Sequence, residues 1–319
     1  MKKVIVSGIQ PTGELHIGNY LGAVKNWIDL QNDPAYDCFF FIADWHSMTI
    51  DYEPSEKQRQ IKNLVADLLA LGVDPNKAHI YVQSSVTATA ELAWIFNTLT
   101  PMSELEKMTQ YKDKSARNAE NINTGLFAYP VLQAADILIN KAELVPVGED
   151  QVQHVEITRV IAKKFNNKFG KLFPEPHALL TKVPRVMSLT EPTKKMSKSH
   201  GPKTCIFISD APDEIYAKIR KAVTDEAGIQ NLLDLVELFD ESGLTTAHLK
   251  KDFAVGELKN VELKDTLAEL IANTFATFRE RRQKITDREI KEVLMHGHEH
   301  AAKIAAHTMR AVRELVGLE

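Results

Sequence analysis

The sequence has very little cysteine and no long hydrophobic run. Its 319 residues include only Cys38 and Cys205, which are far apart and outside any CxxC spacing. This excludes a disulfide framework and a cysteine-based zinc or iron–sulfur site. No stretch approaches the length of a membrane span, and the first twenty residues have no apolar core behind a basic start. We therefore expect a cytoplasmic protein.

A strong net charge is also missing. The chain has 39 Lys and Arg against 43 Asp and Glu, a formal net charge of -4. Any nucleic-acid partner would therefore be held by local basic patches rather than by the field of the whole protein, and a general DNA-binding protein is disfavoured. The 44% hydrophobic and 26% charged residues are typical of a globular protein with a sizeable core.

Strand-like and helix-like segments alternate through the first half of the chain. Short apolar runs at residues 4–6, 38–47, 79–85 and 143–151 predict strands, and segments of helical periodicity lie between them. This order is typical of an α/β protein with a doubly wound parallel sheet, a Rossmann-like fold.

Polar residues gather where the first three predicted strands end, at residues 10–19, 44–47 and 83–85. The carboxyl ends of parallel strands meet at one edge of the sheet, where ligands bind in such folds. We therefore expect these segments to form one cleft.

A change in pattern near Lys203 predicts a domain boundary. Residues 1–203 would form a nucleotide-binding catalytic domain with a helical insertion at about 92–142. Residues 204–319 are nearly all helical in pattern and would form a second domain. Thr286 starts a capping-box pattern that predicts the last helix.

The stretch SGIQPTGELHIGNYLGAV, at residues 7–24, lies at the first strand-to-helix turn. A helix that starts near Ile17 would direct its free N–H groups and positive dipole end at a phosphate. Neither GxGxxG nor GxxxxGK[ST] is present, so this would be a different phosphate-binding turn. His16 and Asn19 could donate hydrogen bonds to ATP, and Gly18 would let adenine lie against the backbone. A helix-capping role is the alternative for His16.

The stretch TKKMSKSHGP, at residues 193–202, is too polar for a core element and predicts a surface loop. Its lysine and serine side chains are donors that suit a polyphosphate leaving group. A solvated basic loop is the alternative.

The pairing of HIGN after the first strand with KMSKS after the last resembles the two signature motifs of class I aminoacyl-tRNA synthetases. The further stretches KMTQYKDKSA, YPVLQAADIL and VPVGEDQ, in this order, resemble bacterial and mitochondrial tryptophanyl-tRNA synthetases. The resemblance covers nearly the whole chain and is dense up to about Ser199. It implies ATP-dependent attachment of L-tryptophan to tRNA(Trp) through an adenylate, by a homodimer.

The resemblance also implies three sets of site residues. Catalytic residues would be Lys195, Lys198, Lys114, His16 and Asn19. ATP would contact Gln10, Pro11, Thr12, Gly18, Asn19, Gly148, Glu149, Asp150, Val186, Lys195, Met196, Ser197, Lys198 and Ser199. Tryptophan would contact Asp136, Tyr129, Gln133, Val6, His46, Val145, Val147 and Gln151, with Asp136 accepting the indole N–H.

The implied reaction needs no side-chain nucleophile, and no GxSxG motif is present. Lysines and glycines would position the substrates and stabilise charge on the departing pyrophosphate. The partners would be tRNA(Trp), ATP with Mg²⁺ and L-tryptophan, with no membrane, no DNA and no protein-bound metal.

Three alternatives stay open. Gln133, three residues before Asp136, could donate to a phenol hydroxyl, as in a tyrosyl-tRNA synthetase. A nucleotidylyltransferase also uses a HxGH-type turn, although it would not need KMSKS and a large helical domain. A binding or regulatory relative would be expected to have a decayed lysine loop.

Two charged stretches in the last third have weaker interpretations. His296 and His300 share a helix face in HGHEH, which also contains His298, and could ligate a metal, but solvated histidines are the commoner case. FRERRQK, at residues 278–284, would be either a solvated face or a contact to the tRNA backbone.

Overall fold

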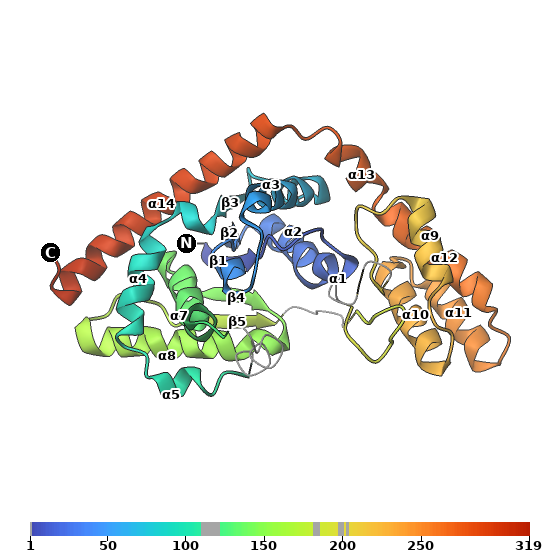
Figure 1. Cartoon of the computed structure of the whole chain (residues 1–319), viewed down its shortest axis with the longest axis horizontal. Helices are drawn as coiled ribbons and strands as arrows, with labels where there is room; N and C mark the ends of the chain where they lie inside the picture. The colour runs from blue at the N-terminus through green and yellow to red at the C-terminus, as the bar shows by residue number, and fades with distance from the viewer. Residues whose placement is uncertain (1, 110–121, 181–185, 197–200, 202–203) are drawn as a thin grey trace. The chain divides into compact units, whose positions relative to one another are not determined.

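The computed structural model describes residues 2–109, 122–180, 186–196, 201 and 204–319. Its centre is a sheet of five parallel strands in the order β3-β2-β1-β4-β5 (Figure 1). The predicted doubly wound parallel sheet is therefore confirmed. The strands are β1 (Lys3–Ile9), β2 (Tyr36–Ile42), β3 (Ala78–Val82), β4 (Leu144–Val147) and β5 (His177–Leu180).

Helices connect these strands and form most of the second half of the described chain. The first half contains α1 (Ile17–Asn19), η1 (Tyr20–Val24), α2 (Lys25–Asn32), η2 (His46–Thr49), α3 (Pro54–Leu71), η3 (Gln83–Ser85), α4 (Ala88–Asn97), α5 (Met102–Leu105), α7 (Thr124–Ile139), η4 (Glu149–Gln151) and α8 (Val152–Phe169). The second half contains α9 (Pro212–Arg220), α10 (Glu226–Phe239), α11 (Leu244–Ala254), α12 (Asn260–Thr274), α13 (Ala276–Arg282) and α14 (Asp287–Val316).

The strand β5 was not among the predicted elements. It has only four residues, HALL, and prolines precede it at Pro174 and Pro176, so its local pattern is that of a turn-rich segment. Its pairing with β4, which sets Val145 beside Ala178, is a long-range contact that local periodicity does not report.

The apolar run of β2 is buried, as expected of a strand covered on both faces. From Cys38 to Ile42 no side chain is more than 5% exposed. Phe40 stacks on Trp27 of α2, with ring centroids 4.4 Å apart. These contacts hold the centre of the sheet rigid, so the loops at the strand ends start from fixed positions.

The chain divides into two compact units that do not follow a single boundary near position 203. One unit comprises Met1–Gly13, Asn26–Lys182 and Ile285–Glu319, and the other comprises Glu14–Lys25 and Val183–Lys284. The last helix therefore groups with the sheet rather than with the other C-terminal helices. The sequence predicts this helix from its period but does not show which core it covers.

The helix α14 lies along the edge strand β3 (Figure 1). Thr286 caps it, as predicted, by accepting a hydrogen bond from the Glu289 backbone at 3.2 Å. Its buried face, Ala301, Ala305, Met309 and Val312, belongs to the same hydrophobic core as the sheet. The helix thereby covers a strand edge that would otherwise be exposed.

The second unit is a helical bundle joined to the short segment Glu14–Lys25. An apolar stripe of α12 is buried there, with Leu263, Leu267 and Ile271 fully enclosed. The backbone N–H of Ile17 donates to the carbonyl of Ile206 at 3.0 Å, which holds α1 within this unit. No helix of the described residues is long and apolar enough to cross a bilayer.

Candidate active site

Asp136 is a buried carboxylate in the last turn of α7, only 3% exposed. The helix starts at Asn123, whose side-chain oxygen accepts a hydrogen bond from the Leu126 backbone at 2.9 Å. Asn123 also donates to the carbonyl of Thr49 at 3.2 Å, so the same residue ties the start of α7 to η2. This double anchoring fixes where the carboxylate lies.

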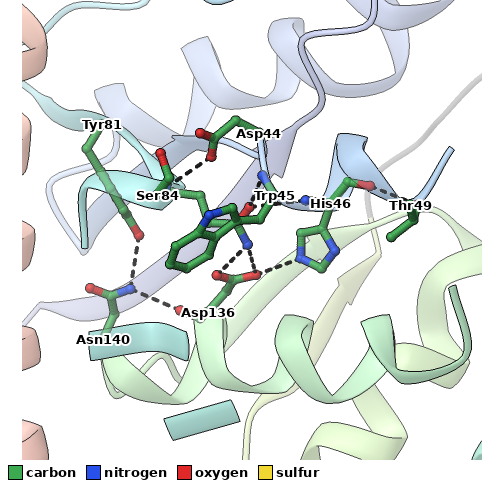
Figure 2. A network of polar contacts seen from close by, with 9 residues as sticks. Asp44, Trp45, His46, Thr49, Tyr81, Ser84, Asp136 and Asn140 are labelled. Carbon is green, nitrogen blue, oxygen red and sulfur yellow. Dashed lines mark hydrogen bonds and ion pairs between the residues drawn. The ribbon is translucent and has the colours of Figure 1, made fainter. Parts of the chain in front are cut away.

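Two side chains from the ends of neighbouring strands hold the Asp136 carboxylate (Figure 2). The Gln83 amide, after β3, donates to Oδ1 and Oδ2, both at 2.8 Å. Nε2 of His46, after β2, lies 2.8 Å from Oδ2. A carboxylate has about four acceptor positions, and these contacts use three of them. One position is therefore left for a ligand.

The Gln83 carbonyl oxygen joins the two strand ends. It accepts hydrogen bonds from the backbone N–H groups of Trp45 and His46, at 3.1 and 3.4 Å. The Asp44 carboxylate accepts from the Ser84 backbone at 3.0 Å, in the opposite direction (Figure 2). The polar segments after β2 and β3 therefore meet, as their place at the strand ends predicted.

Burial and hydrogen bonding act in opposite directions on Asp136. Burial raises the pKa of its carboxyl group, whereas His46 and Gln83 lower that pKa. Burial also raises the pKa of Tyr81, which lies near Asp136 and accepts a hydrogen bond from Asn140 at 3.2 Å. The site thus contains a carboxylate whose ionised form depends on its two donors.

Tyr129 lies about two helical turns before Asp136 on α7. Its hydroxyl is 2.8 Å from Nε2 of His154, on α8, and its ring meets the His46 ring edge-on at 6.3 Å. Gln133 lies between Tyr129 and Asp136 on the same helix and is half-buried. The amide that binds Asp136 is therefore that of Gln83, not that of Gln133.

A cavity of about 330 Å³ lies beside this helix, with an almost entirely apolar lining. Within the described part of the chain, Tyr129 is the predicted tryptophan-contacting residue that lines it. The other lining residues come from η2, α4 and α7 and the segments before them: Trp45, Met48, Thr49, Ala93, Asn97, Asn123, Gly125, Ala128 and Leu132.

The other predicted tryptophan and ATP residues of the sheet unit lie within β1 and β4 or directly after them. Val6, Val145 and Val147 are strand residues that are no more than 9% exposed. Gly148 precedes η4 and Gln151 ends it, and η4 leads directly into α8 and its N-terminal N–H groups. The backbone of Glu149 and Asp150 forms this same turn, and Gln10, Pro11 and Thr12 follow β1.

The HIGN motif forms a capping box in the second unit. Nδ1 of His16 accepts a hydrogen bond from the Gly18 backbone at 3.0 Å, and Asn19 accepts from the His16 backbone at 3.1 Å. A Cβ on Gly18 would lie 2.8 Å from the His16 ring and 3.7 Å from the Val186 side chain. The glycine is required for this cap, and the capping role left open for His16 is present in the structure.

The start of the KMSKS motif closes a short hairpin in the same unit. The Met196 backbone donates to the carbonyl of Val186 at 2.9 Å, and both side chains are buried. Lys194 forms an ion pair with Glu191 at 2.5 Å, whereas Lys195 is exposed. Met196 therefore anchors the loop in the protein core. The predicted residues Lys114, Ser197, Lys198 and Ser199 lie outside the described residues.

Gln83 is a site residue that the sequence did not single out. Its position after the third predicted strand placed it in the expected cleft, but its contact with Asp136 joins residues 53 positions apart. A buried glutamine at a strand end, followed in the chain by a helix with a buried aspartate, was the available signal.

Comparisons with known proteins show what this chain is similar to. Residues 2–276 match the family described as tRNA synthetases class I (W and Y). The tryptophan–tRNA ligase of Caldanaerobacter subterraneus subsp. tengcongensis is 43% identical over 100% of this chain and 99% of its own. A tryptophanyl-tRNA synthetase structure from Mycoplasma pneumoniae has a TM-score of 0.88 and 32% identity, covering 100% and 99% of the two chains. The Campylobacter jejuni enzyme complexed with ADP and tryptophan has a TM-score of 0.85 and 36% identity, covering 98% and 99%.

Proposed function

The chain belongs to the class I tRNA synthetases for tryptophan and tyrosine, and we propose that it is the tryptophan enzyme of that family. It joins L-tryptophan to tRNA(Trp) with ATP, as a tryptophan–tRNA ligase. Curated relatives that match this chain over nearly their full length carry that name. The structure complexed with ADP and tryptophan is similar over nearly the whole chain.

The geometry of Asp136 is the observation that carries the choice of tryptophan. Indole has one N–H donor and no acceptor, so a pocket that selects it needs a fixed, buried acceptor. Asp136 is such an acceptor, because Gln83 and His46 hold both of its oxygens and leave one acceptor position open. A tyrosine hydroxyl would instead be best served by a donor and an acceptor together.

The reaction follows from positioning and charge. The tryptophan carboxylate attacks the α-phosphorus of ATP in line, giving tryptophanyl adenylate and pyrophosphate. A terminal ribose hydroxyl of the tRNA then takes the aminoacyl group and AMP leaves. In our proposal Lys114, Lys195 and Lys198, with Mg²⁺ that accompanies ATP, stabilise the departing pyrophosphate. The turn of Gly148 and the start of α8 supply backbone N–H donors.

Pyrophosphate exchange into ATP tests the proposal. We expect exchange to depend on tryptophan and to be far slower with tyrosine supplied at equal concentration. Preference for tyrosine would contradict the substrate while leaving the reaction class intact. Exchange with neither amino acid would contradict the reaction itself.

A homodimer is the proposed assembly, and one apolar surface supports it. Met48 lines the apolar cavity and is 50% exposed, while Trp94 and Ile122 are 71% and 50% exposed. Trp94 and Ile122 are chain neighbours of the lining residues Ala93 and Asn123. Large apolar side chains around a hydrophobic cavity are typical of a face that a second copy covers. Trp94→Glu should yield a monomer in sedimentation experiments, and an unchanged mass would exclude this face.

The helical unit is the proposed tRNA-binding region. Arg281 and Arg282 end α13, and Arg281 is exposed. With a net charge of -4, such local patches must supply the phosphate contacts. We also propose a cytoplasmic location, because the reaction needs tRNA, ATP and tryptophan together.

A further inference from the structure

The HGHEH stretch of α14 is the place where this helix approaches the edge strand most closely. A Cβ on Gly297 would lie 1.9 Å from the carbonyl oxygen of Ile80, so only glycine allows this approach. Nδ1 of His298 lies 3.2 Å from the hydroxyl of Ser85, just after β3. The close packing brings the next histidine of the stretch, His300, to the start of the strand.

His300 meets two chemically suitable side chains there. Its ring stacks on His79 of β3, with centroids 3.7 Å apart and planes 6° from parallel. Nε2 of His79 lies 3.3 Å from Oδ1 of Asp37, on β2. One ligand atom from each of the three residues lies within 4.8 Å of the other two. Three different elements thus bring two imidazoles and a carboxylate together.

We propose that Asp37, His79 and His300 form a binding site for a divalent transition-metal ion such as Zn²⁺. Two imidazoles and one carboxylate are a donor set that Zn²⁺ accepts, with water completing the coordination. In the sequence, His296 was the partner considered for His300, but His296 is exposed and the structure brings Asp37 and His79 to His300 instead.

The charge state of the cluster suits a cation. The adjacent His79 lowers the pKa of the Asp37 carboxyl group, so that the carboxylate is ionised. Burial, with smaller contributions from His79, His296 and Lys303, lowers the pKa of His300, which favours the neutral ring that metals bind. The cluster therefore offers one carboxylate and, in His300, a neutral nitrogen donor beside the second imidazole.

The distance between the Asp37 and His79 ligand atoms agrees with tetrahedral coordination, whereas the His300 ring must rotate to complete the site. Two atoms bound at about 2.0–2.1 Å with tetrahedral angles lie roughly 3.3–3.4 Å apart, which is the separation of Asp37 and His79. Parallel rings direct their nitrogens along parallel lines, so the half-exposed His300 ring must rotate out of the stack to reach the ion. Nδ1 of His79 is buried without a hydrogen-bond partner in the described structure, so Nε2, which already faces Asp37, is the nitrogen that would bind the ion.

The proposed metal site is separate from the catalytic residues. Asp37 and His79 each lie second in their strands, whereas the Asp136 network lies beyond the other ends of the same strands. From Asp37 to Ile42 a strand extends about 17 Å. A bound ion would therefore tie α14 to the sheet, and it would not enter the aminoacylation reaction.

Titration of the chelator-treated full chain with zinc sulfate, followed by calorimetry, tests the site. We expect one equivalent per chain with micromolar affinity, and a rise in the unfolding temperature. His300→Gln and Asp37→Asn should each weaken binding by about 10- to 100-fold. His307→Gln, an exposed histidine on the same helix, is the matched control and should leave binding unchanged.

Cobalt(II) provides a second measurement that does not depend on stability. In the unmodified chain it should show the intense visible absorption of tetrahedral coordination, and His300→Gln should lose that absorption while circular dichroism shows an intact fold. No stoichiometric zinc binding, or equal binding by all three variants, would overturn the proposal. Binding that only His307→Gln removes would also overturn it.

Discussion

The amino-acid end and the phosphate end of the proposed site are built in different ways. Asp136, Gln83 and His46 are buried, belong to one compact unit and are joined by hydrogen bonds at 2.8 Å. The predicted phosphate contacts are distributed: Gly148 lies in that unit, whereas Lys195 lies in the other and is exposed.

This difference separates recognition from catalysis. A buried network has its acceptor oriented before the substrate arrives, so its binding energy is not spent on ordering side chains. An exposed lysine stays hydrated in the free protein, so it carries little desolvation penalty there. It stabilises the transition state when negative charge develops beside it. Variants at the first end should therefore act on the tryptophan requirement, and variants at the second on the rate of adenylate formation.

The largest expected effect belongs to Asp136→Ala. It removes the acceptor of the indole N–H and leaves Gln83 and His46 without their shared partner. We expect kcat/KM for tryptophan to fall on the order of 300-fold, mostly through KM. This corresponds to a loss of about 3 to 4 kcal/mol of transition-state stabilisation. Pyrophosphate exchange measures this, with Asp136→Asn as the conservative variant. An unchanged tryptophan KM in both variants would remove Asp136 from recognition.

Lys195→Ala should have the next largest effect, on rate rather than on binding. Losing one donor to the departing pyrophosphate should cost about 3 kcal/mol in the transition state, about a hundredfold in single-turnover adenylate formation. Lys198→Ala should behave in the same way. Lys194→Ala is the matched control, because Lys194 is paired with Glu191. Equal rates for Lys194→Ala and Lys195→Ala would exclude a specific role for Lys195.

A smaller, pH-dependent effect is expected from Gln83→Leu. The Gln83 amide lowers the pKa of Asp136, so without it burial raises that pKa further. A protonated Asp136 is a poorer acceptor, and the rise in tryptophan KM as the pH falls should therefore begin at a higher pH than in the unmodified chain. Protonation of Asp136 should weaken tryptophan binding by about 1.5 kcal/mol, which is roughly a tenfold rise in KM.

The control for Gln83→Leu is Gln31→Leu. Gln31 is also buried and also holds a loop, by donating to the Gly72 carbonyl and accepting from the Asp74 backbone, both at 2.9 Å. It should lower stability without moving the pH profile. A shift of equal size in both variants would assign the effect to general loosening of the fold.

The sequence predicted the parallel sheet, four of its strands and the meeting of the strand ends, because apolar runs and their polar ends are local signals. It did not predict β5 or the packing of α14 on β3, since both depend on contacts between residues far apart in the chain. The same limit explains Gln83 and the Asp37, His79 and His300 cluster. HIGN was predicted as a ligand-binding turn with helix capping as the alternative for His16, and the structure shows His16 and Asn19 forming the capping box of α1.

The smallest effect on chemistry, and the sharpest contrast with the buried network, should come from Arg281→Gln with Arg282→Gln. Arg279 is left in place because it donates to the Ala272 carbonyl at 2.6 Å and so ties α13 to α12. Removing two phosphate contacts should weaken tRNA binding roughly tenfold and reduce the slope of log affinity against log salt by about 2.

The matched control for this double variant is Arg288→Gln with Arg310→Gln, which removes equal charge from exposed positions on α14. Adenylate formation should be unaffected in both, because no tRNA takes part in that step. Filter binding across a salt series distinguishes the two double variants. If both lose tRNA affinity equally, net charge rather than the end of α13 governs binding, and the proposed contact is wrong.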